Sequence, residues 1–426
     1  MDMRIAPEIE LASRAASCRQ IDGCRVSGST HLINVLDLGV QALTGVFPAS
    51  AAQPVSAGPL QLMLCPESGL LQLNHSFEPT EMYGDNYGYR SGLNQSMINH
   101  LSDKVAYLER LVSLQPGDVV VDIGSNDATS LKAYRSPGIR RIGIDPTGKK
   151  FAEYYPANIE LVPDFFSAAA YRAVEHKPAR IVTSIAMFYD LEAPVQFVRE
   201  IAAILADDGI WHFEQSYMPA MLRTNSYDTI CHEHLEYYSL RVVKSILEQA
   251  GMKLVDVVMN AINGGSFAVT AAKAGNTAVQ PNQAVIDWLL GQEDRMGLNT
   301  PRPYREFEER VYRHRDDLTR LIRSLNAAGK TVLGYGASTK GNVLLQFCGL
   351  TNRDILAIAE VNEDKFGRVT PGTHIPIISE VEARAMKPDY MLVLPWHFKD
   401  GIVRREKDYL ASGGHLILPF PEIEII

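Results

Sequence analysis

The sequence predicts an α/β protein with a central, doubly wound parallel sheet, a small β-rich module before it and a second α/β unit after it. Three observations predict this class. The 426 residues exceed what one hydrophobic core usually serves. Apolar strand patterns alternate with helical patterns through the middle of the chain. A strand–glycine–helix pattern then begins a second time near residue 331.

Four segments differ in pattern and predict the domain organisation. Residues 1–75 are turn-rich and β-like, so we expect a small N-terminal module there. Residues 76–273 carry the βα alternation of the central domain, and residues 274–330 form a helical linker around a charged helix at 304–325. Residues 331–426 form the second α/β domain. Strands are expected at 32–36, 60–64, 118–123, 141–144, 180–184 and 209–214, and helices at 195–205 and 240–250.

The composition excludes several classes of protein. With 46% hydrophobic and 21% charged residues, the chain is not disordered, collagen-like or a coiled coil. No apolar run reaches the roughly 20 residues of a membrane helix, and the first residues lack the apolar stretch of a signal peptide. We therefore expect a cytoplasmic protein with no membrane partner. A net charge of −9 without a basic block argues against a nucleic-acid partner.

The first chemical signal is a glycine-bearing turn after the strand at 118–123. Gly124 lets a ligand approach the backbone, and the following helix offers free N–H groups. Asp145 ends the next strand, where an acidic side chain accepts hydrogen bonds from a ribose. The dinucleotide fingerprint is missing, because Asn126 and Thr129 replace its glycines. This favours S-adenosylmethionine, which has no phosphate, over NAD, although a glycine used only for packing is the alternative. The predicted cofactor-binding residues are Asp122, Gly124, Ser125, Asn126, Asp127, Asp145, Pro146 and Ser184.

A cluster of histidines and tyrosines is the second signal. It follows the strand at 209–214, at the edge where doubly wound sheets bind ligands. In an extended segment His232 and His234 would share one face, with Glu233 opposite. A histidine that titrates near neutral pH suits proton abstraction. The alternative is an exposed polar turn before a helix. Upstream, Tyr83, Tyr87, Tyr89 and Arg90 form an aromatic cluster whose hydroxyls either stabilise an oxyanion or only fill a loop.

Two short cysteine segments have the spacing of zinc knuckles. Cys24 and Cys65 each precede a serine by three positions, so Ser27 and Ser68 stand where second thiolates would be. Two thiolates and two hydroxyls do not make a closed structural zinc site. A rearranged zinc site and two metal-free turns remain equally open at this point.

The order of these motifs resembles the sugar C-methyltransferases that act on nucleotide-linked 4-keto-deoxysugars. The resemblance covers the whole chain and includes YGYRSG, VVDIGSND, CHEHLEYYS, NGGSF, LGYGASTKGN and LVLPWHFKD. It implies an N-terminal zinc module, a central S-adenosylmethionine-dependent methyltransferase sheet and a C-terminal Rossmann-like domain that helps to hold the nucleotide sugar. The chain departs from the family at Ser27 and Ser68, and Ala128 stands where many members carry glycine.

The resemblance also implies residue roles. His234 corresponds to the general base, with His232 and Glu233 close to it, and Tyr87 and Tyr89 correspond to an active-site tyrosine segment. His234 would remove the proton next to the sugar ketone, and the resulting carbanion would attack the sulfonium methyl. The resemblance favours C3 as the methylated carbon, with C5 as the alternative. The expected substrate-binding residues are Tyr83, Arg90, Tyr237, Lys340, Asn342 and His374.

Two of these expectations have alternatives. Lys340 at the start of a helix suits an anion such as the substrate's diphosphate, or else belongs to a packing turn and is solvated. For the whole protein, the alternatives are an NAD-dependent nucleotide-sugar dehydrogenase or epimerase and a non-catalytic sugar-nucleotide-binding protein.

Overall fold

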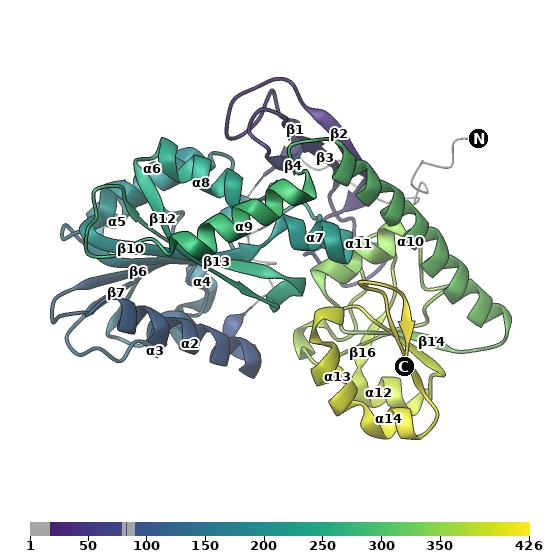
Figure 1. Ribbon diagram of the computed structural model, residues 1–426. Coiled ribbons are helices and arrows are strands. Elements are labelled where there is room, and N and C mark those ends of the chain that lie inside the picture. Colours follow the sequence, from purple (N-terminus) through teal and green to yellow (C-terminus); the bar gives the residue numbers. More distant parts are fainter. Residues whose placement is uncertain (1–17, 79–81, 83–89) are drawn as a thin grey trace.

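The computed structural model describes residues 18–78, 82 and 90–426, so Tyr83, Tyr87 and Tyr89 lie outside the described residues. Figure 1 shows the central sheet and its helices on one side of the molecule and the C-terminal domain on the other. The N-terminal strands lie between them at the top of this view (Figure 1). The α/β class predicted from the sequence is confirmed, with a central sheet, a small β module and a second α/β domain.

The central sheet has seven strands in the order β12-β13-β10-β9-β6-β7-β8. Their bounds are β6 (Val119–Ile123), β7 (Arg140–Ile144), β8 (Ile159–Val162), β9 (Ala179–Ile185), β10 (Leu205–Ser216), β12 (Met252–Asn260) and β13 (Ser266–Lys273). Strands β6 to β10 are parallel, whereas β13 runs antiparallel to β10 and β12. The expectation of a wholly parallel sheet is therefore wrong at this edge. The turn between β12 and β13 is too short for a parallel crossover.

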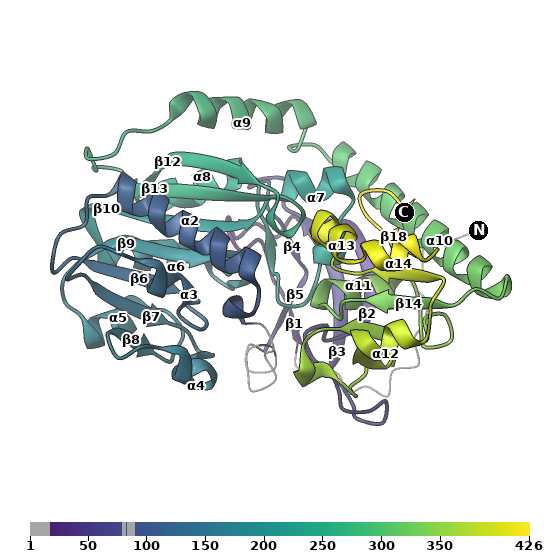
Figure 2. The ribbon, with the colours of Figure 1, turned by 90° about the horizontal axis from the view of Figure 1, so that it is seen from below.

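Helices cover both faces of this sheet. Their bounds are α2 (Gln95–Leu111), α3 (Thr129–Ala133), α4 (Gly148–Phe151), α5 (Ala168–Val174), α6 (Pro194–Ile204), α7 (Met218–Thr224) and α8 (Leu240–Gln249). Helices α2 and α3 lie on one face, and α5, α6 and α8 on the other (Figures 1 and 2). Helix α8 forms where it does because the Ser239 side chain accepts a hydrogen bond from the Val242 N–H and its apolar residues share one buried face.

The N-terminal module consists of two small sheets. Its strands are β1 (Cys18–Gln20), β2 (Ile33–Ala42), β3 (Ala57–Leu64), β4 (Leu71–Leu73) and β5 (His75–Phe77). The larger sheet, in the order β11-β4-β3-β2, is completed by β11 (Glu236–Tyr237), which comes from the middle of the chain. Because β11 belongs to the middle of the chain but completes a sheet of the N-terminal module, the sheets do not mark where one domain ends and the next begins. The domain boundaries at 75, 273 and 330 therefore stay a prediction.

The C-terminal domain has a six-stranded sheet in the order β16-β15-β14-β17-β18-β19, with only β19 antiparallel. The strands are β14 (Val332–Tyr335), β15 (Ile358–Glu360), β16 (Ile377–Ser379), β17 (Tyr390–Val393), β18 (His415–Leu418) and β19 (Glu424–Ile425). The helices are α11 (Thr339–Phe347), α12 (Glu380–Ala385), α13 (Lys399–Arg405) and α14 (Lys407–Ala411). The order of the first five strands is that of a doubly wound nucleotide-binding sheet.

Two helices, α9 (Gln283–Met296) and α10 (Arg302–Ala327), connect the two large sheets. The apolar face of α10 packs into one hydrophobic core that the N-terminal sheet shares with the C-terminal domain. The Cys24 and Cys65 turns instead belong to the core of the central domain. The N-terminal module is thus packed against both larger domains. Among the described residues no helix is long and apolar enough to cross a membrane.

Candidate active site

Strand β6 carries a buried carboxylate, Asp122, next to the turn that follows it. Asp122 is 3% exposed, and its Oδ1 accepts a hydrogen bond of 2.5 Å from Thr183 Oγ1. Burial, together with the charge of Asp145, raises the pKa of Asp122 to about 7 against this hydrogen bond. Within the described residues no lysine or arginine forms an ion pair with Asp122. A cationic ligand beside it would restore the charged form, so the site fits the ammonium end of S-adenosylmethionine.

Asp145 holds the same turn from the next strand. Its Oδ2 accepts the N–H of Asn126 at 2.7 Å, and its Oδ1 accepts the N–H and hydroxyl of Thr147 at 2.6 Å. Tyr155 donates to the carbonyl of Asn126 at 3.0 Å and lies 2.7 Å from Ser125 Oγ. The turn is therefore fixed before any ligand binds, with Asn126 in the left-handed region at φ 50°. Pro146 follows Asp145 and is partly exposed at the same strand end.

Residues 90–92 pack directly on this turn. The N–H of Ser91 donates to Asn126 Oδ1, and the N–H of Gly92 donates to Asp127 Oδ2, both at 3.0 Å. A Cβ on Gly92 would lie 2.4 Å from that oxygen, so only glycine fits. Arg90, predicted to bind substrate, lies 4.3 Å above the Tyr154 ring and 4.0 Å from Asp127.

Ser184 lies in β9 but faces the core. Its hydroxyl accepts the indole N–H of Trp211 at 3.0 Å, and the side chain is fully buried. The hydroxyl is committed to this contact, so a direct role in cofactor binding stays a prediction that this geometry does not favour.

The histidine segment is a turn and not an extended strand. The N–H of His234 donates to the carbonyl of Cys231 at 3.1 Å. The expectation that His232 and His234 share a face is therefore wrong, because a turn sends successive side chains in different directions. His232 Nε2 lies 3.2 Å from the carbonyl of Gly58, and its ring meets Phe77 edge-on at 4.7 Å.

Glu233 also points away from His234. An ideal Cβ on Gly45 would lie 2.7 Å from Glu233 Oε1, so this carboxyl lies against the N-terminal module. Burial raises its pKa above the usual value. His232 and Glu233 thus anchor the turn to the N-terminal module, and only His234 is directed elsewhere.

His234 packs on a residue at the carboxyl edge of the central sheet. Its ring centroid lies 4.3 Å from that of Tyr189, and its Nδ1 lies 2.8 Å from the carbonyl of Thr229. That contact gives Nδ1 the proton and leaves Nε2 as the basic nitrogen. Burial, assisted by the charge of Lys340, lowers the pKa of His234 to about 4 against the hydrogen bond to Thr229. The imidazole is therefore neutral at pH 7 and able to accept a proton.

A short series of contacts joins His234 to the cofactor turn. Tyr189 lies two positions beyond Met187, in the segment that follows β9. A Cβ on Gly124 would lie 3.2 Å from Met187 Cγ, and β9 pairs with β6 directly. Sequence reasoning missed Tyr189, although its position just after a strand end could have indicated it. The base candidate and the cofactor turn thus share one edge of the sheet.

Four further residues that the sequence predicted to bind substrate lie in different surroundings. Tyr237 is buried in β11, where it pairs with Leu71. Asn342 donates to the carbonyl of Thr44 at 2.8 Å and so joins α11 to the N-terminal module. His374 is partly exposed in the loop before β16, with φ 57°. Lys340 donates to the carbonyl of Asn263 at 3.0 Å, in the turn between β12 and β13. Only Lys340 of these reaches the region of His234.

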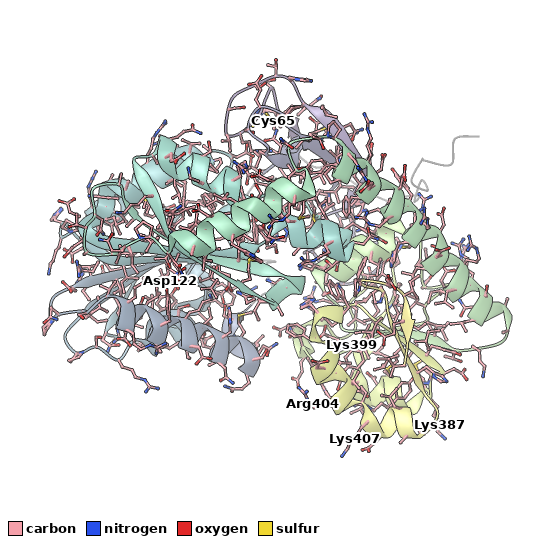
Figure 3. The ribbon with its side chains drawn as sticks, in the orientation of Figure 1. Cys65, Asp122, Lys387, Lys399, Arg404 and Lys407 are labelled. Carbon is pink, nitrogen blue, oxygen red and sulfur yellow. The ribbon has the colours of Figure 1, made fainter. Side chains whose placement is uncertain are left out.

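The two cysteine turns do meet, but they do not form a zinc site. Cys24 Sγ lies 3.1 Å from Ser68 Oγ, and Ser27 Oγ lies 3.5 Å from Cys65 Sγ. Each hydroxyl therefore pairs with the thiol of the other turn. No cluster of three or more histidine, cysteine or acidic side chains suited to a metal occurs in the part of the chain that the structure describes. Two thiols and two hydroxyls do not match the ligand set of a structural zinc. Figure 3 shows Cys65 in the N-terminal module, well apart from Asp122 in the central sheet.

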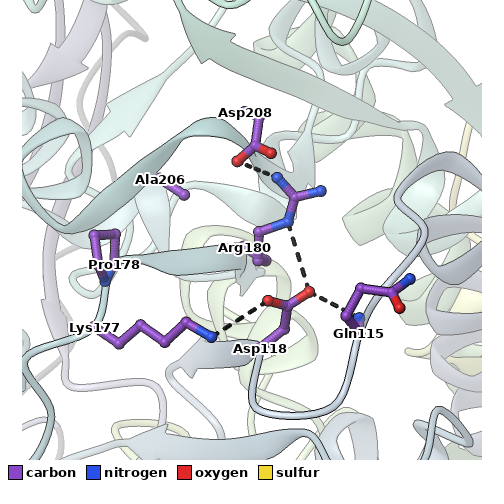
Figure 4. Close-up of a pocket in the computed structure, with 7 residues that line it drawn as sticks. All are labelled: Gln115, Asp118, Lys177, Pro178, Arg180, Ala206 and Asp208. Atoms are coloured by element: carbon purple, nitrogen blue, oxygen red, sulfur yellow. Dashed lines mark hydrogen bonds and ion pairs between the residues drawn. The ribbon is translucent and has the colours of Figure 1, made fainter.

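A surface hollow lies at the opposite edge of the central sheet, where β6, β9 and β10 begin (Figure 4). Its charged side chains pair with one another: Asp118 with Lys177 and Arg180, and Arg180 with Asp208. Because ligands bind at the carboxyl ends of the strands in such sheets, we assign this hollow no part in the chemistry.

The chain is similar to a known enzyme over nearly its whole length. The C-methyltransferase NovU of Streptomyces niveus is 35% identical over 413 residues, which make up 96% of this chain and 97% of NovU. Three family models match in succession: "Putative zinc binding domain" at 24–83, "Methyltransferase domain" at 93–257 and "C-methyltransferase C-terminal domain" at 261–421.

Solved methyltransferase structures are similar to less than half of the chain. The CcbJ methyltransferase from Streptomyces caelestis has a TM-score of 0.32 and 11% identity, with 41% of this chain and 89% of that chain covered. The mitomycin 7-O-methyltransferase MmcR has a TM-score of 0.30 and 15% identity, with 42% of this chain and 55% of that chain covered. Likeness of this degree says nothing about substrate or mechanism.

Proposed function

The chain belongs to the C-methyltransferase family that includes NovU, and from this premise we propose that it methylates a nucleotide-linked 4-keto-6-deoxysugar at C3. It is an S-adenosylmethionine-dependent methyltransferase. The sugar substrate and the methylated carbon are our proposal, supported by the order of motifs along the chain and by the surroundings of His234.

Asp122, Asp145 and the backbone of residues 124–127 would hold S-adenosylmethionine. When bound, this cofactor supplies a methyl group already activated by a positively charged sulfur, so methyl transfer needs no metal. Asp122 suits its ammonium group because burial raises the pKa of this carboxyl when no cation is beside it. Asp145 suits the ribose hydroxyls, because a carboxylate that already accepts backbone N–H groups is fixed in orientation.

His234 would remove the proton from the sugar carbon next to the ketone. The ketone makes this proton acidic, and the neutral imidazole accepts it at Nε2 while Nδ1 stays bonded to the carbonyl of Thr229. The electron pair of the broken C–H bond moves into the enolate. The carbon of that enolate would form the new bond to the methyl carbon while the bond from that carbon to sulfur breaks, and S-adenosylhomocysteine would leave with the sulfur electron pair. General base catalysis contributes about 10²–10⁴-fold. Holding the enolate carbon, the methyl carbon and the sulfur in line contributes up to roughly 7–11 kcal/mol of the barrier.

One observation carries this proposal. His234 packs on Tyr189, which follows the strand next to the cofactor turn, and its pKa lies below neutrality because it is buried. A partly exposed, neutral imidazole at the carboxyl edge of the sheet is what an enolate-forming reaction requires. By contrast, His314 has both ring nitrogens engaged, with Tyr227 and the carbonyl of Pro419, and so has none left to accept a proton.

Mass spectrometry of a panel of nucleotide 4-keto sugars tests the proposal. Each sugar is incubated with the protein and S-adenosylmethionine, and we expect one sugar to gain a single methyl group on carbon. His234→Asn should abolish the gain while S-adenosylmethionine still binds in calorimetry. His176→Asn, at an exposed histidine, is the matched control and should retain full turnover. A methyl group found on oxygen, or full turnover by His234→Asn, would contradict the mechanism.

A further inference from the structure

The turn between β14 and α11 repeats the strand–glycine–helix pattern of the cofactor turn but is filled by protein. A Cβ on Gly336 would lie 2.7 Å from Pro395 Cγ, and a Cβ on Gly341 would lie 2.7 Å from Leu394 Cβ. These glycines therefore allow the segment after β17 to pack closely. The N–H of Ala337 donates to a carboxylate, Glu360 Oε2, at 2.9 Å. The space that these glycines leave is therefore occupied by protein and is not open to a diphosphate.

Lys340 extends from this turn into the central domain. Its Nζ donates to the carbonyl of Asn263 at 3.0 Å, and Asn263 is in the left-handed region at φ 55°. The neighbouring Gly264 lies under the ring of Trp396, because a Cβ there would come within 2.9 Å of that ring. The lysine is thus placed in the interface between the central and C-terminal domains, beside the histidine turn.

A buried carboxylate from the central domain faces this lysine. Asp228 is 1% exposed, and its Oδ2 accepts the indole N–H of Trp396 at 2.8 Å. Burial lowers the pKa of Lys340, and the charge of Asp228 opposes that effect. In turn the charge of Lys340 lowers the pKa of both His234 and His397, for which burial is the larger cause. Asp228 therefore helps to keep Lys340 charged, close to the general base candidate.

Three buried polar atoms of this region have no hydrogen-bond partner among the described residues. They are Oδ1 of Asp228 itself, Oγ1 of Thr229, the next residue in the chain, and Nδ1 of His397, which follows Trp396. Buried polar groups in native proteins are almost always paired, so these atoms are open to a polar ligand. The charged lysine and the unpaired atoms together suit an oxygen-rich group with developing negative charge.

We propose that Lys340, brought by the C-terminal domain and held by the carbonyl of Asn263, is a further catalytic residue that stabilises the enolate oxygen of the substrate. This inference rests on the proposed function and replaces the expectation that Lys340 binds the diphosphate. The proton taken from the sugar carbon goes to His234, and the negative charge left on the ketone oxygen is balanced by the ammonium group. The same positive charge adds to the effect of burial in lowering the pKa of His234.

The pH dependence of the reaction tests whether the charge of Lys340 lowers the pKa of His234. The titratable groups around His234 are Tyr189, Cys231 and Glu233 from the central domain, and Lys340 from α11 with Asp228 and His397 near it. His234 must be neutral to work, so kcat/KM falls as pH drops through its pKa. Loss of the positive charge in Lys340→Met makes His234 easier to protonate. The acid limb of the profile should therefore move to higher pH.

The rate of the reaction tests whether Lys340 stabilises the enolate oxygen. We expect Lys340→Met to lower kcat by about 10²–10³-fold, the usual loss when one oxyanion donor is removed. Exchange of the sugar proton with solvent deuterium, measured without the cofactor, should fall by a similar factor. Lys340→Arg keeps the charge and should retain the wild-type acid limb and exchange. Thermal unfolding and S-adenosylmethionine binding, both unchanged, would show that the methionine variant is folded.

Three results would overturn the inference. A Lys340→Met variant with wild-type exchange and an unmoved acid limb would exclude the role. If Lys340→Met weakened the binding of dTDP and GDP in calorimetry but left the exchange unaffected, Lys340 would instead bind the diphosphate of the substrate. If wild-type protein neither exchanges nor methylates any keto sugar in the panel, the proposed function fails and this inference fails with it.

Discussion

Two strand–glycine–helix turns in this protein look alike and are used differently. In the first, Gly124 follows β6, and Asp145 at the end of the next strand accepts the N–H of Asn126. In the second, Gly336 follows β14, and Glu360 at the end of the next strand accepts the N–H of Ala337. Both turns therefore use the same carboxylate-to-backbone contact to fix their shape.

The two turns differ in what lies over the glycine. A Cβ on Gly124 would come only within 3.2 Å of the flexible Met187 side chain, whereas a Cβ on Gly336 would overlap Pro395 at 2.7 Å. The first turn also follows the buried carboxylate of Asp122, which forms no ion pair with the lysines and arginines that the structure describes. The second turn is followed by Lys340. A glycine turn thus becomes a ligand site only if the neighbouring strand end leaves it open.

The largest effect on the first turn is expected from Asp145→Asn. This change removes the charge that fixes the turn and receives the ribose, so the affinity for S-adenosylmethionine should fall by about 2–3 kcal/mol, or 30- to 150-fold. Isothermal titration calorimetry measures the loss. Asp22→Asn, at an exposed carboxylate, is the control and should bind as the wild type does. Unchanged affinity in Asp145→Asn would mean that the first turn does not hold the cofactor.

Gly336→Ala tests the second turn through stability. Its positive φ of 81° costs about 1–2 kcal/mol for any residue with a Cβ, and the overlap with Pro395 adds about 1–3 kcal/mol. Cofactor affinity should not change. Gly367→Ala is the matched control, because it has a similar φ of 76° and open space around its Cβ. Equal destabilisation of the two variants, measured by urea unfolding, would show that Pro395 does not fill the second turn.

A smaller effect is expected at Ser184, which lies beside the first turn but faces the core. Ser184→Ala should destabilise the fold by about 1–3 kcal/mol, because the buried indole N–H of Trp211 loses its acceptor. S-adenosylmethionine should bind as tightly as before. A loss of affinity without a loss of stability would instead assign Ser184 to the cofactor site.

The smallest effect is expected for metal removal. The Cys24 and Cys65 turns are held by thiol–hydroxyl hydrogen bonds and by packing, so a chelator should not change the melting temperature of the wild type. Mass spectrometry of the native protein should find no stoichiometric zinc. The double variant Ser27→Cys, Ser68→Cys is the positive control, because four thiolates should bind one zinc and make the melting temperature sensitive to the chelator. Zinc bound to the wild type would contradict this reading.

The regular parts of the fold could be predicted from the sequence because they depend on local patterns. The apolar runs of β6, β7, β9 and β10 and the capped, amphipathic α8 were all recognisable. The β12–β13 hairpin was missed, because a buried antiparallel strand at a sheet edge has the same composition as a parallel one. The direction of a strand in a sheet is set by the connection to its neighbour and not by the composition of the strand itself.

The site was only partly predictable because it depends on contacts between distant segments. Asp122 lies near the end of β6, Asp145 directly follows β7 and His234 belongs to a distinctive histidine motif, so local sequence indicated all three. The directions of His232 and Glu233 are fixed by Gly58 and Gly45 of the N-terminal module, which no local pattern reveals. The pairing of Asp228 with Trp396 across the domain interface was equally hidden.

The most direct test of the account is proton exchange at the sugar carbon. A nucleotide-linked 4-keto-6-deoxysugar is incubated in deuterium oxide with the wild type or with His234→Asn, in the absence of S-adenosylmethionine, and followed by proton NMR. The account predicts that the wild type replaces the hydrogen at C3 and that His234→Asn does not, although both variants bind the cofactor. Equal exchange in the two proteins would show that His234 is not the base.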